Sequence, residues 1–288
     1  MDNTVEKAWA KVNLGLKILG RREDGYHDLV SIFQTVDLHD RLTFEPAEGG
    51  QIDLICSDQS LPTGEENLIY RAVVLLREET GVDRGVRIHL EKQIPVGAGL
   101  GGGSSDAATT LRALNRLWRL HLDARVLHRL AESLGSDVPF FLRPGTALAT
   151  GRGEQLDYLS WLPQVLYILV YPGFSVSTGW AFQNLKLDLT KDSKYIKFLN
   201  SIKKSGQIPT SGLLACLEND FLPLIETTYP QVREVEDRLT DLGASAVSLS
   251  GSGSMFFGIF SDRKTALKAH VQLEQDGYEV YCCCPVLD

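Results

Sequence analysis

Five glycines and two serines stand close together in the middle of the chain, after a predicted strand and before a predicted helix. Glycines let backbone N–H groups turn toward a ligand without obstruction by a Cβ, and the start of a helix adds a positive partial charge. The two serine hydroxyls can cap the helix, bind phosphate or hold a metal. We therefore predict a phosphate-binding loop rather than a flexible turn with an ordinary serine cap. The segment reads Pro95, Val96, Gly97, Ala98, Gly99, Leu100, Gly101, Gly102, Gly103, Ser104, Ser105.

The loop matches none of the common nucleotide-binding patterns well. Gly97, Gly99 and Gly102 satisfy G-x-G-x-x-G, which alone is a weak signal. The acidic residue about twenty positions further on, Asp123, follows a predicted helix instead of a strand, which argues against a dinucleotide site. The loop also lacks the Lys-Ser/Thr ending of a P-loop, and the chain lacks the H-R-D and D-F-G motifs of protein kinases. The pattern indicates another class of phosphate loop, with ATP as its ligand.

Two charged residues are candidates for catalysis of phosphoryl transfer, which requires an oriented alcohol and stabilised charge on the γ-phosphoryl oxygens. Asp137 stands in a polar Gly-Ser-Asp turn and can accept the proton of a hydroxyl; the alternative is a turn or cap aspartate. Lys11 shares the polar face of the first predicted strand with Asn13. A lysine near Asp137 would keep the carboxylate ionised and contact the transferring group. The alternative is a solvated strand lysine.

The elements that must position these residues are an irregular mixture of strands and helices. Because they do not alternate regularly, we predict an α+β fold with mixed or antiparallel sheets rather than a doubly wound one. The length of 288 residues, 43% of them hydrophobic, allows two cores, so we predict an N-terminal ATP-binding and catalytic lobe at 1–158 and a C-terminal lobe at 159–288. The strands are predicted at 8–19, 29–38, 41–45, 52–56, 86–91, 146–150, 165–171, 245–248 and 255–260, and the helices at 67–79, from 104 or 105 onward, and at 123–134, 195–204, 230–242 and 263–276.

The overall composition excludes several classes of partner. The formal net charge is −8 and no dense run of Lys or Arg is present, which argues against nucleic-acid binding. The five cysteines show neither metal-ligand spacing nor a disulfide framework, so reduced thiols are expected. No secretory signal and no apolar run of about 20 residues is present. We expect a soluble, cytoplasmic protein with a small-molecule substrate and no membrane partner.

Three separated motifs resemble the kinase superfamily that phosphorylates galactose, homoserine, mevalonate and phosphomevalonate. They are Lys11-Val-Asn-Leu, the glycine loop, and Ser248-Leu-Ser-Gly-Ser-Gly-Ser254. Within this superfamily, four segments resemble the branch that acts on 4-diphosphocytidyl-2-C-methyl-D-erythritol in the non-mevalonate isoprenoid pathway. Asp-Gly-Tyr-His is the most specific of them, since the glycine loop is shared with sister kinases. The four segments are Ala10 to Leu14, Asp24 to His27, Ile32 to Gln34 and Gly135 to Phe141.

The resemblance implies a two-lobed fold with the active site in the cleft between the lobes. ATP with Mg²⁺ would lie on the glycine loop, and a substrate with a cytidine diphosphate group would lie opposite and be phosphorylated on its 2-hydroxyl. Lys11 and Asp137 would be the catalytic residues. The substrate would meet the residues Asn13, Tyr26, His27, Phe182, Ser250 and Gly251, with the two aromatic rings sandwiching the cytosine and His27 contacting its edge.

Three residues keep open alternatives at this point, and one departs from the family pattern. Asn67 either caps the first helix or contacts the adenine, and Lys92 either contacts a phosphate or is a surface lysine. Ser250 stands where this family often has Thr, and the serine also provides a hydroxyl. Asp106 stands where Asn is also familiar, and it either helps to hold Mg²⁺ or starts the helix. The Mg²⁺ ligands are left unassigned.

Two other functions remain open on the sequence alone. A sister kinase for homoserine or a mevalonate-type alcohol would keep the loop and Asp137, but would give no reason for Asp-Gly-Tyr-His and would need an arginine for the substrate carboxylate. A non-catalytic sensor with the same fold would keep the ligand loops and lose the catalytic pair. The presence of both Lys11 and Asp137 favours an enzyme.

Overall fold

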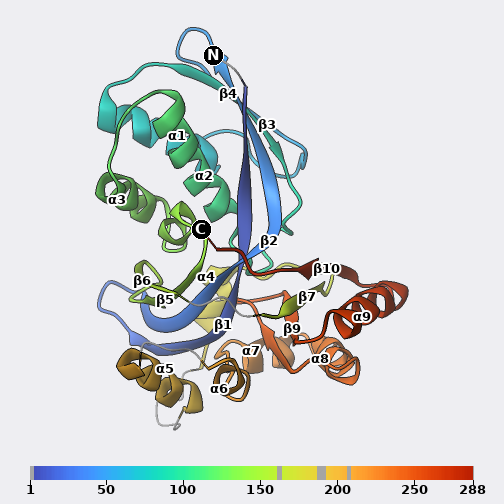
Figure 1. Cartoon of the computed structure of the whole chain (residues 1–288). Helices are drawn as coiled ribbons and strands as arrows, with labels where there is room; N and C mark the ends of the chain where they lie inside the picture. Colours follow the sequence, from blue (N-terminus) through green and yellow to red (C-terminus); the bar gives the residue numbers. More distant parts are fainter. Residues whose placement is uncertain (1–2, 161–163, 187–192, 206–208, 288) are drawn as a thin grey trace. The chain divides into compact units, whose positions relative to one another are not determined.

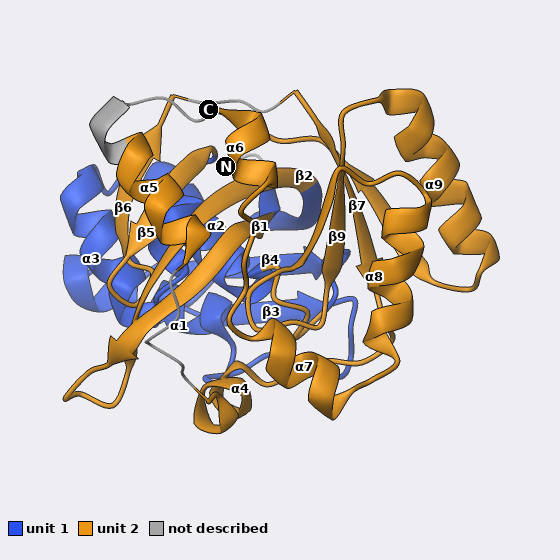
Figure 2. Ribbon diagram, turned by 90° about the horizontal axis from the view of Figure 1, so that it is seen from below, with its two compact units in different colours: residues 1–10, 38–95, 101–144 blue, residues 11–37, 96–100, 145–288 orange. Residues whose placement is uncertain are grey.

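The computed structural model describes residues 3–160, 164–186, 193–205 and 209–287. The chain forms two compact units whose segments alternate along the sequence (Figure 2). The first unit contains Met1–Ala10, Leu38–Pro95 and Gly101–Pro144, and the second contains Lys11–Asp37, Val96–Leu100 and Gly145–Asp288. The predicted boundary between folding domains at 158 and 159 stays a prediction.

In the first unit, three helices lie on one face of a sheet (Figure 1). The strands are the second half of β2 (His27–Ala47), β3 (Ile52–Cys56) and β4 (Gly85–Glu91); β2 pairs antiparallel with β4, and β3 pairs parallel with it. The helices are α1 (Leu68–Thr80), α2 (Gly102–Leu117) and α3 (Ala124–Leu134), followed by the short 3-10 helix η1 (Val138–Leu142).

The local sequence explains where α1 begins and ends. The side chain of Asn67 accepts a hydrogen bond from the Ile69 N–H at 2.9 Å, which satisfies a donor that the first turn leaves unpaired. Gly81 follows the helix with φ +68°, a conformation that favours glycine, and its N–H bonds to the Arg77 carbonyl. The capping role of Asn67 is thereby confirmed, and its contact with adenine stays a prediction.

The second unit contains two groups of strands. The first half of β2 pairs with β5 (Thr146–Thr150), which pairs in turn with β6 (Gln155–Leu159). A separate four-stranded sheet has the order β10-β7-β9-β8, all antiparallel. Its strands are β7 (Leu166–Tyr171), β8 (Ala246–Leu249), β9 (Phe256–Phe260) and β10 (Glu279–Cys283), and the helices of the unit are α4 (Thr178–Asn184), α5 (Lys194–Ser205), α6 (Thr210–Leu214), α7 (Leu222–Thr228), α8 (Val232–Asp241) and α9 (Arg263–Gln275).

The prediction of an α+β chain with mixed and antiparallel sheets is confirmed. Two predicted strands, 29–38 and 41–45, are instead one continuous strand, β2, because the buried Asp40 stays within the strand and pairs internally. The strands β6 and β10 and the helices α4, α6 and α7 were not predicted. They are at most seven residues long, too short for a clear periodic pattern.

The strand β1 (Thr4–Arg21) is buried on both faces at its centre, including the face that carries the polar residues Lys11 and Asn13. Tyr195 from α5 covers part of the polar face. Its hydroxyl donates to the Leu14 carbonyl at 2.6 Å and accepts the Ile32 N–H at 2.9 Å. An added Cβ at Gly15, which has φ +87°, would lie 2.4 Å from the Tyr195 ring. Glycine at this position therefore lets the ring pack against the strand.

No helix in the described part of the chain is long and apolar enough to span a membrane. All five cysteines are free thiols.

Candidate active site

The first part of the glycine loop, residues 96–100, is fixed by backbone contacts within the second unit. Its carbonyl oxygens accept hydrogen bonds from the N–H groups of Lys11, Val176 and Met255 and from the hydroxyl of Ser250, at 3.0–3.1 Å. A flexible turn would lack such a set of bonds to three separate segments. The loop is therefore held in one conformation by the strand and turns around it.

Close packing requires glycine in this part of the loop. A Cβ at Gly99 would lie 2.0 Å from the carbonyl oxygen of Ser250, and φ at Gly99 is +80°. A Cβ at Gly251, where φ is +57°, would lie 3.1 Å from the Gly99 carbonyl oxygen. The glycine loop and the late serine-glycine turn are thus brought into backbone contact, as two of the predicted ligand-binding segments.

The second part of the loop begins α2 in the first unit. The helix starts at Gly102, two or three residues earlier than predicted, and Gly101 precedes it in the left-handed conformation with φ +73°. No side chain caps this helix start. Ser104 and Ser105 lie inside the first turns, and Ser105 is only 1% exposed. The alternative of an ordinary serine cap is therefore wrong, because Gly101 takes the cap position.

The next two glycines differ in the space around them. A Cβ at Gly102 would lie 3.1 Å from both the Lys92 Nζ and the Ile94 side chain, whereas a Cβ at Gly103 would meet no atom within 4 Å. Gly102 is therefore constrained by packing, whereas Gly103 faces open space.

Lys92 is not a surface lysine. Its ammonium pairs with Asp40 and lies 3.1 Å from Asp106 Oδ2, and both carboxylates are almost fully buried. The other oxygen of Asp40 accepts the N–H groups of Gln93 and Ile94 at 2.6 and 2.9 Å. Together with the distance to Gly102, these contacts place the ammonium beside the first turn of α2.

Burial and the neighbouring charges shift the pKa values of Asp106 and Lys92. Burial raises the pKa of Asp106 to about 8, and the charge of Asp40 adds to this against the opposing effect of Lys92. Burial acts to lower the pKa of Lys92, but the two carboxylates outweigh it and raise that pKa. The Oδ1 atom of Asp106 is buried without a hydrogen-bond partner among the described residues. With Asp106 neutral at pH 7, the one positive charge of Lys92 is balanced by the one negative charge of Asp40.

Asp137 precedes η1 in the first unit and is half-buried. Its carboxylate makes no capping hydrogen bond to that helix, so the alternative of a cap aspartate is wrong. The preceding turn closes through the Val138 N–H, which donates to the Gly135 carbonyl at 3.2 Å.

Lys11 lies in the second unit and is only 3% exposed, which excludes a solvated strand lysine. Its Nζ donates to Asn13 Oδ1 at 2.5 Å and lies 5.1 Å from the centre of the Phe33 ring. Asn13 in turn donates to the Ser31 hydroxyl at 2.9 Å. Lys11 and Asn13 therefore share one contact network, as their common strand face predicted. The pairing of Lys11 with Asp137, which belongs to the other unit, stays a prediction.

The aromatic residues predicted for cytosine lie at the start of β2 and on α4. His27 stacks on Phe182 with ring centres 5.0 Å apart and planes at 22°, and Phe182 also packs edge-to-face on Phe221. Tyr26 is 54% exposed, and the guanidinium of Arg152 lies 4.8 Å from its ring centre. The structure thus brings His27 to Phe182, while the sandwich of a base between Tyr26 and Phe182 stays a prediction.

The protonation of His27 follows from its surroundings. Partial burial, helped by the positive charge of Arg21, lowers the pKa of His27 below its ordinary value of 6.5. A neutral imidazole has one donor and one acceptor nitrogen, which is the set needed to pair with the edge of a base.

Two residues that contact the predicted site segments, Asn219 and Arg152, were not predicted from the sequence. Asn219 donates to the carbonyls of Leu249 and Gly251 at 2.8 and 2.9 Å and accepts the Phe221 N–H, so it fixes the serine-glycine turn. Nothing in the local sequence around Asn219 indicates these contacts. Arg152 lies between two glycines, a sequence pattern typical of a turn, so a turn at this residue could have been predicted.

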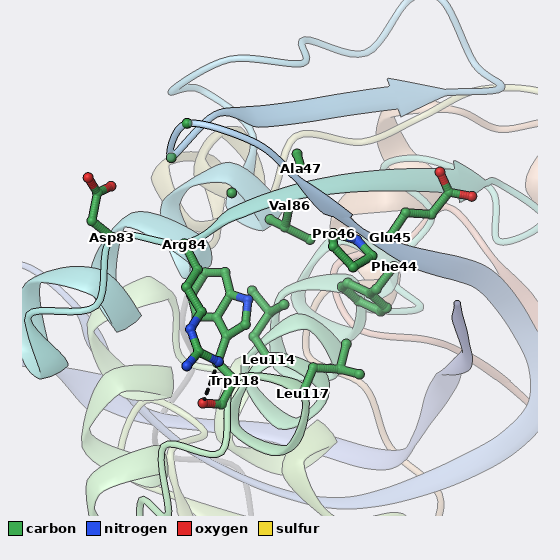
Figure 3. Close-up of a pocket in the computed structure, with 13 residues that line it drawn as sticks. Phe44, Glu45, Pro46, Ala47, Asp83, Arg84, Val86, Leu114, Leu117 and Trp118 are labelled. Atoms are coloured by element: carbon green, nitrogen blue, oxygen red, sulfur yellow. Dashed lines mark hydrogen bonds between the residues drawn. The ribbon is translucent and has the colours of Figure 1, made fainter. Parts of the chain in front are cut away.

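A pocket of about 580 Å³ lies in the first unit, between the end of β2, the start of β4 and the end of α2 (Figure 3). Its walls include the buried side chains of Phe44, Val86 and Trp118, and the Arg84 Nη1 donates to the Trp118 carbonyl at 3.1 Å. None of the predicted site residues lines it.

Comparison with known proteins connects two stretches of the chain to one family. Residues 67–145 match the GHMP kinases N terminal domain, and residues 202–279 match the GHMP kinases C terminal domain. The chain is 43% identical over 274 residues to a 4-diphosphocytidyl-2-C-methyl-D-erythritol kinase of Prosthecochloris aestuarii, covering 95% of this chain and 94% of the relative. It is 45% identical over 260 residues to the enzyme of that name from Pelotomaculum thermopropionicum, covering 90% of each chain.

Solved structures agree with this relationship. A crystal structure of 4-(cytidine 5'-diphospho)-2C-methyl-D-erythritol kinase superposes with a TM-score of 0.79 at 38% identity, covering 98% of this chain and 99% of the other. A homoserine kinase from Cytophaga hutchinsonii also reaches a TM-score of 0.79, at 20% identity, over 100% of this chain and 96% of the other. At that identity the second likeness shows the fold alone.

Proposed function

Since the chain belongs to the 4-diphosphocytidyl-2-C-methyl-D-erythritol kinase family, we propose that it transfers the γ-phosphoryl group of ATP to the 2-hydroxyl of that compound. One structural observation carries the ATP site. The helix α2 begins at a left-handed Gly101 with no side-chain cap, so its first N–H groups and its positive partial charge are available to an anion.

In this proposal, residues 95–105 hold the triphosphate. The buried ammonium of Lys92 adds positive charge beside the first turn of α2, although the carboxylate of Asp40 neutralises much of that charge at long range. Asn67, whose amide accepts the Ile69 N–H and donates to the Pro62 carbonyl, would meet the adenine beside the start of α1. The loop, Lys92 and Asn67 together make up the proposed ATP site.

Mg²⁺ is proposed to accompany ATP. The described residues contain no group of three or more acidic, His or Cys side chains that would form a metal cage. Mg²⁺ commonly keeps several waters and binds through substrate phosphates and one or two protein ligands, so a site without a protein cage fits it. Bound there, it would neutralise charge on the phosphate oxygens.

Asp137 and Lys11 are proposed as the catalytic pair. Asp137 would accept a hydrogen bond from the substrate hydroxyl, orient it toward the γ-phosphorus and take its proton as the new O–P bond forms. Lys11, held by Asn13, would keep the Asp137 carboxylate ionised and stabilise the charge on the transferring phosphoryl oxygens. Because a loose transition state requires little early proton removal, orientation is the larger part of the role of Asp137.

The cytidine group is proposed to bind at Tyr26, His27 and Phe182. Since His27 covers a face of Phe182, it would have to move for the base to enter between the two aromatic rings. Ser250 and Gly251, together with Asn13, would border the rest of the substrate; the hydroxyl of Ser250 already donates to the Gly99 carbonyl. The free cysteines support the reducing cytoplasm as the location of the enzyme.

An assay of ADP release with three alcohols tests the proposed function. We expect ATP-dependent turnover with 4-diphosphocytidyl-2-C-methyl-D-erythritol and little with homoserine or mevalonate. Turnover with either of those two alone would assign the chain to a sister kinase, and ATP binding without turnover of any of the three would favour a sensor.

A further inference from the structure

Two tight turns lie side by side in the second unit. Only the first was predicted from the sequence to contact the substrate. The first joins β1 to β2 and carries Tyr26; the second joins β5 to β6 and spans 151–154. The N–H of Leu29 donates to the Gly151 carbonyl at 2.7 Å, which links the turns. The guanidinium of Arg152 lies 4.8 Å from the centre of the Tyr26 ring.

The second turn is built to hold Arg152 in this place. The carboxylate of Glu154, a residue that is only 8% exposed, accepts the Arg152 N–H at 2.6 Å and lies 3.9 Å from the Arg152 Nε. Gly151 has φ +68°, and a Cβ there would lie 2.8 Å from a Glu154 carboxylate oxygen. Glu154 thus fixes both the backbone and the charge of Arg152.

A neighbouring arginine of the first turn, Arg22, is already paired with two carboxylates. Arg22 donates to Asp24 at 3.0 Å and to Asp28 at 2.9 Å, which braces the turn beneath Tyr26. The Tyr26 N–H also donates to Asp24 at 3.1 Å. The backbone of Tyr26 is therefore fixed by its own turn, and the position of its ring is fixed by Arg152.

We propose that Arg152 is a positioning residue of the cytidine site: by lying on one face of the Tyr26 ring, it orients the ring and leaves the opposite face for the pyrimidine base. An arginine stacks flat on an aromatic ring through its planar, weakly hydrated guanidinium, and the negative face of the ring attracts its charge. A tyrosine that is half exposed would otherwise turn among rotamers, and a base would have to order it on binding. This inference rests on the proposed function, because it assumes that Tyr26 meets the base.

A purely structural clamp between the two turns is the competing explanation. It would predict that loss of Arg152 lowers thermal stability and affects all kinetic constants alike. A positioning role predicts a selective effect on the KM for the cytidine substrate, because the ring contacts the base and neither ATP nor the reacting hydroxyl.

The test uses the full chain with the variants Arg152→Met, Arg152→Lys, Tyr26→Ala and the double variant Arg152→Met/Tyr26→Ala. We expect Arg152→Met to raise the KM for 4-diphosphocytidyl-2-C-methyl-D-erythritol about three- to tenfold. The kcat, the KM for ATP and the melting temperature should stay unchanged, and Arg152→Lys should restore part of the affinity. In the Tyr26→Ala background, Arg152→Met should have no additional effect, because the ring through which it acts is gone.

A matched control is Arg233→Met on α8, where the exposed arginine lies 3.6 Å from Glu226 on α7. The outcomes separate the two claims. Wild-type turnover of the cytidine substrate tests the proposed function. With an active wild type, an unchanged KM in Arg152→Met, or an equal effect of Arg152→Met with and without Tyr26, would overturn the inference alone.

Discussion

Lys11 and Asp137 are held in different ways, and this difference predicts what their substitution does. Lys11 is buried among hydrogen bonds in the centre of β1, so its removal also disturbs Asn13. Asp137 is half-buried and its carboxylate does not cap η1, so Asp137→Asn leaves the start of that helix unchanged. Asp137 is therefore the better residue for a test of catalysis.

Asp137→Asn should remove nearly all turnover and leave the affinities for ATP and substrate within several-fold, because it keeps the shape and deletes the charge. Single-turnover kinetics and calorimetry would measure both. Asp123→Asn is the matched control: Asp123 caps α3, and Asn caps a helix equally well, so activity should be retained. Full activity in Asp137→Asn would refute the catalytic assignment.

Gly103→Ala is a sharper test of the phosphate loop than substitution of its neighbours. Valine at Gly101 or Gly102 should also abolish ATP binding, but left-handed backbone at the first and close packing at the second add structural effects. Gly103 has open space around it, and Ala favours a helix by roughly 0.5–1 kcal/mol over Gly. The variant should melt no lower than the wild type and bind ATP more weakly, because its Cβ occupies the approach of the phosphates.

Calorimetric titration with an ATP analogue measures the nucleotide affinity, and a thermal melt measures the stability. Gly64→Ala serves as control, since a Cβ there also meets no atom within 4 Å. Unchanged nucleotide affinity in Gly103→Ala would mean that the triphosphate does not approach this turn.

At the scale of elements, Tyr195 on α5 holds β1 to β2. Tyr195→Phe would leave the Ile32 N–H and the Leu14 carbonyl without their hydroxyl partner in a buried place. We expect a loss of about 1–3 kcal/mol in the free energy of unfolding, measured by urea denaturation. Tyr229→Phe, which keeps the ring contact with Phe174, is the control and should cost much less. Equal stability of both variants would contradict the role of this hydroxyl.

The buried charges below α2 predict a dependence of stability on pH. The pKa of Asp106 is raised from 3.8 to about 8, so between these values the folded chain holds a proton that the unfolded chain has lost. This group therefore lowers stability progressively as the pH rises from about 4 to about 8. Asp106→Asn imitates the protonated form, so its stability relative to the wild type should be higher at pH 9 than at pH 6.

Thermal melts of both proteins at the two pH values measure this difference. A relative stability of Asp106→Asn that does not change between pH 6 and pH 9 would contradict a protonated Asp106 at neutral pH. Lys92 and Asp40 stay intact in this variant, so the comparison concerns one carboxyl group.

Features that depend on residues close together in the sequence could be predicted, whereas contacts between residues far apart in the chain could not. The helix cap at Asn67, one of the two roles that the sequence left open for this residue, depends on a few neighbouring residues and is confirmed. The contact of Tyr195 with Gly15 joins residues 180 positions apart, and the bond from Lys92 to Asp40 joins residues 52 positions apart. Such pairs have no signature in a single sequence, because only the folded chain brings them together.

At the scale of the whole molecule, the fold by itself does not select the substrate. The chain reaches the same TM-score, 0.79, with a homoserine kinase at 20% identity as with the 4-(cytidine 5'-diphospho)-2C-methyl-D-erythritol kinase at 38%. The same architecture therefore serves alcohols of different chemistry, and function depends on the groups placed on it. For this chain those groups are the residues proposed to hold the cytosine, which explains why Asp-Gly-Tyr-His was the informative motif.

The specificity for the base is the measurement that tests the central claim most directly. A uridine analogue of the substrate replaces the exocyclic amino donor by an acceptor and the N3 acceptor by a donor, so groups arranged for cytosine would be left unpaired. We predict that kcat/KM of the wild type strongly favours the cytidine compound and that His27→Ala narrows this preference, mainly by losing activity on the cytidine compound. Tyr26→Ala and Phe182→Ala should weaken substrate binding by about 1–3 kcal/mol per ring, without a matching loss for ATP. Equal use of the cytidine and uridine compounds by the wild type, or ring truncations that change only the affinity for ATP, would contradict the account.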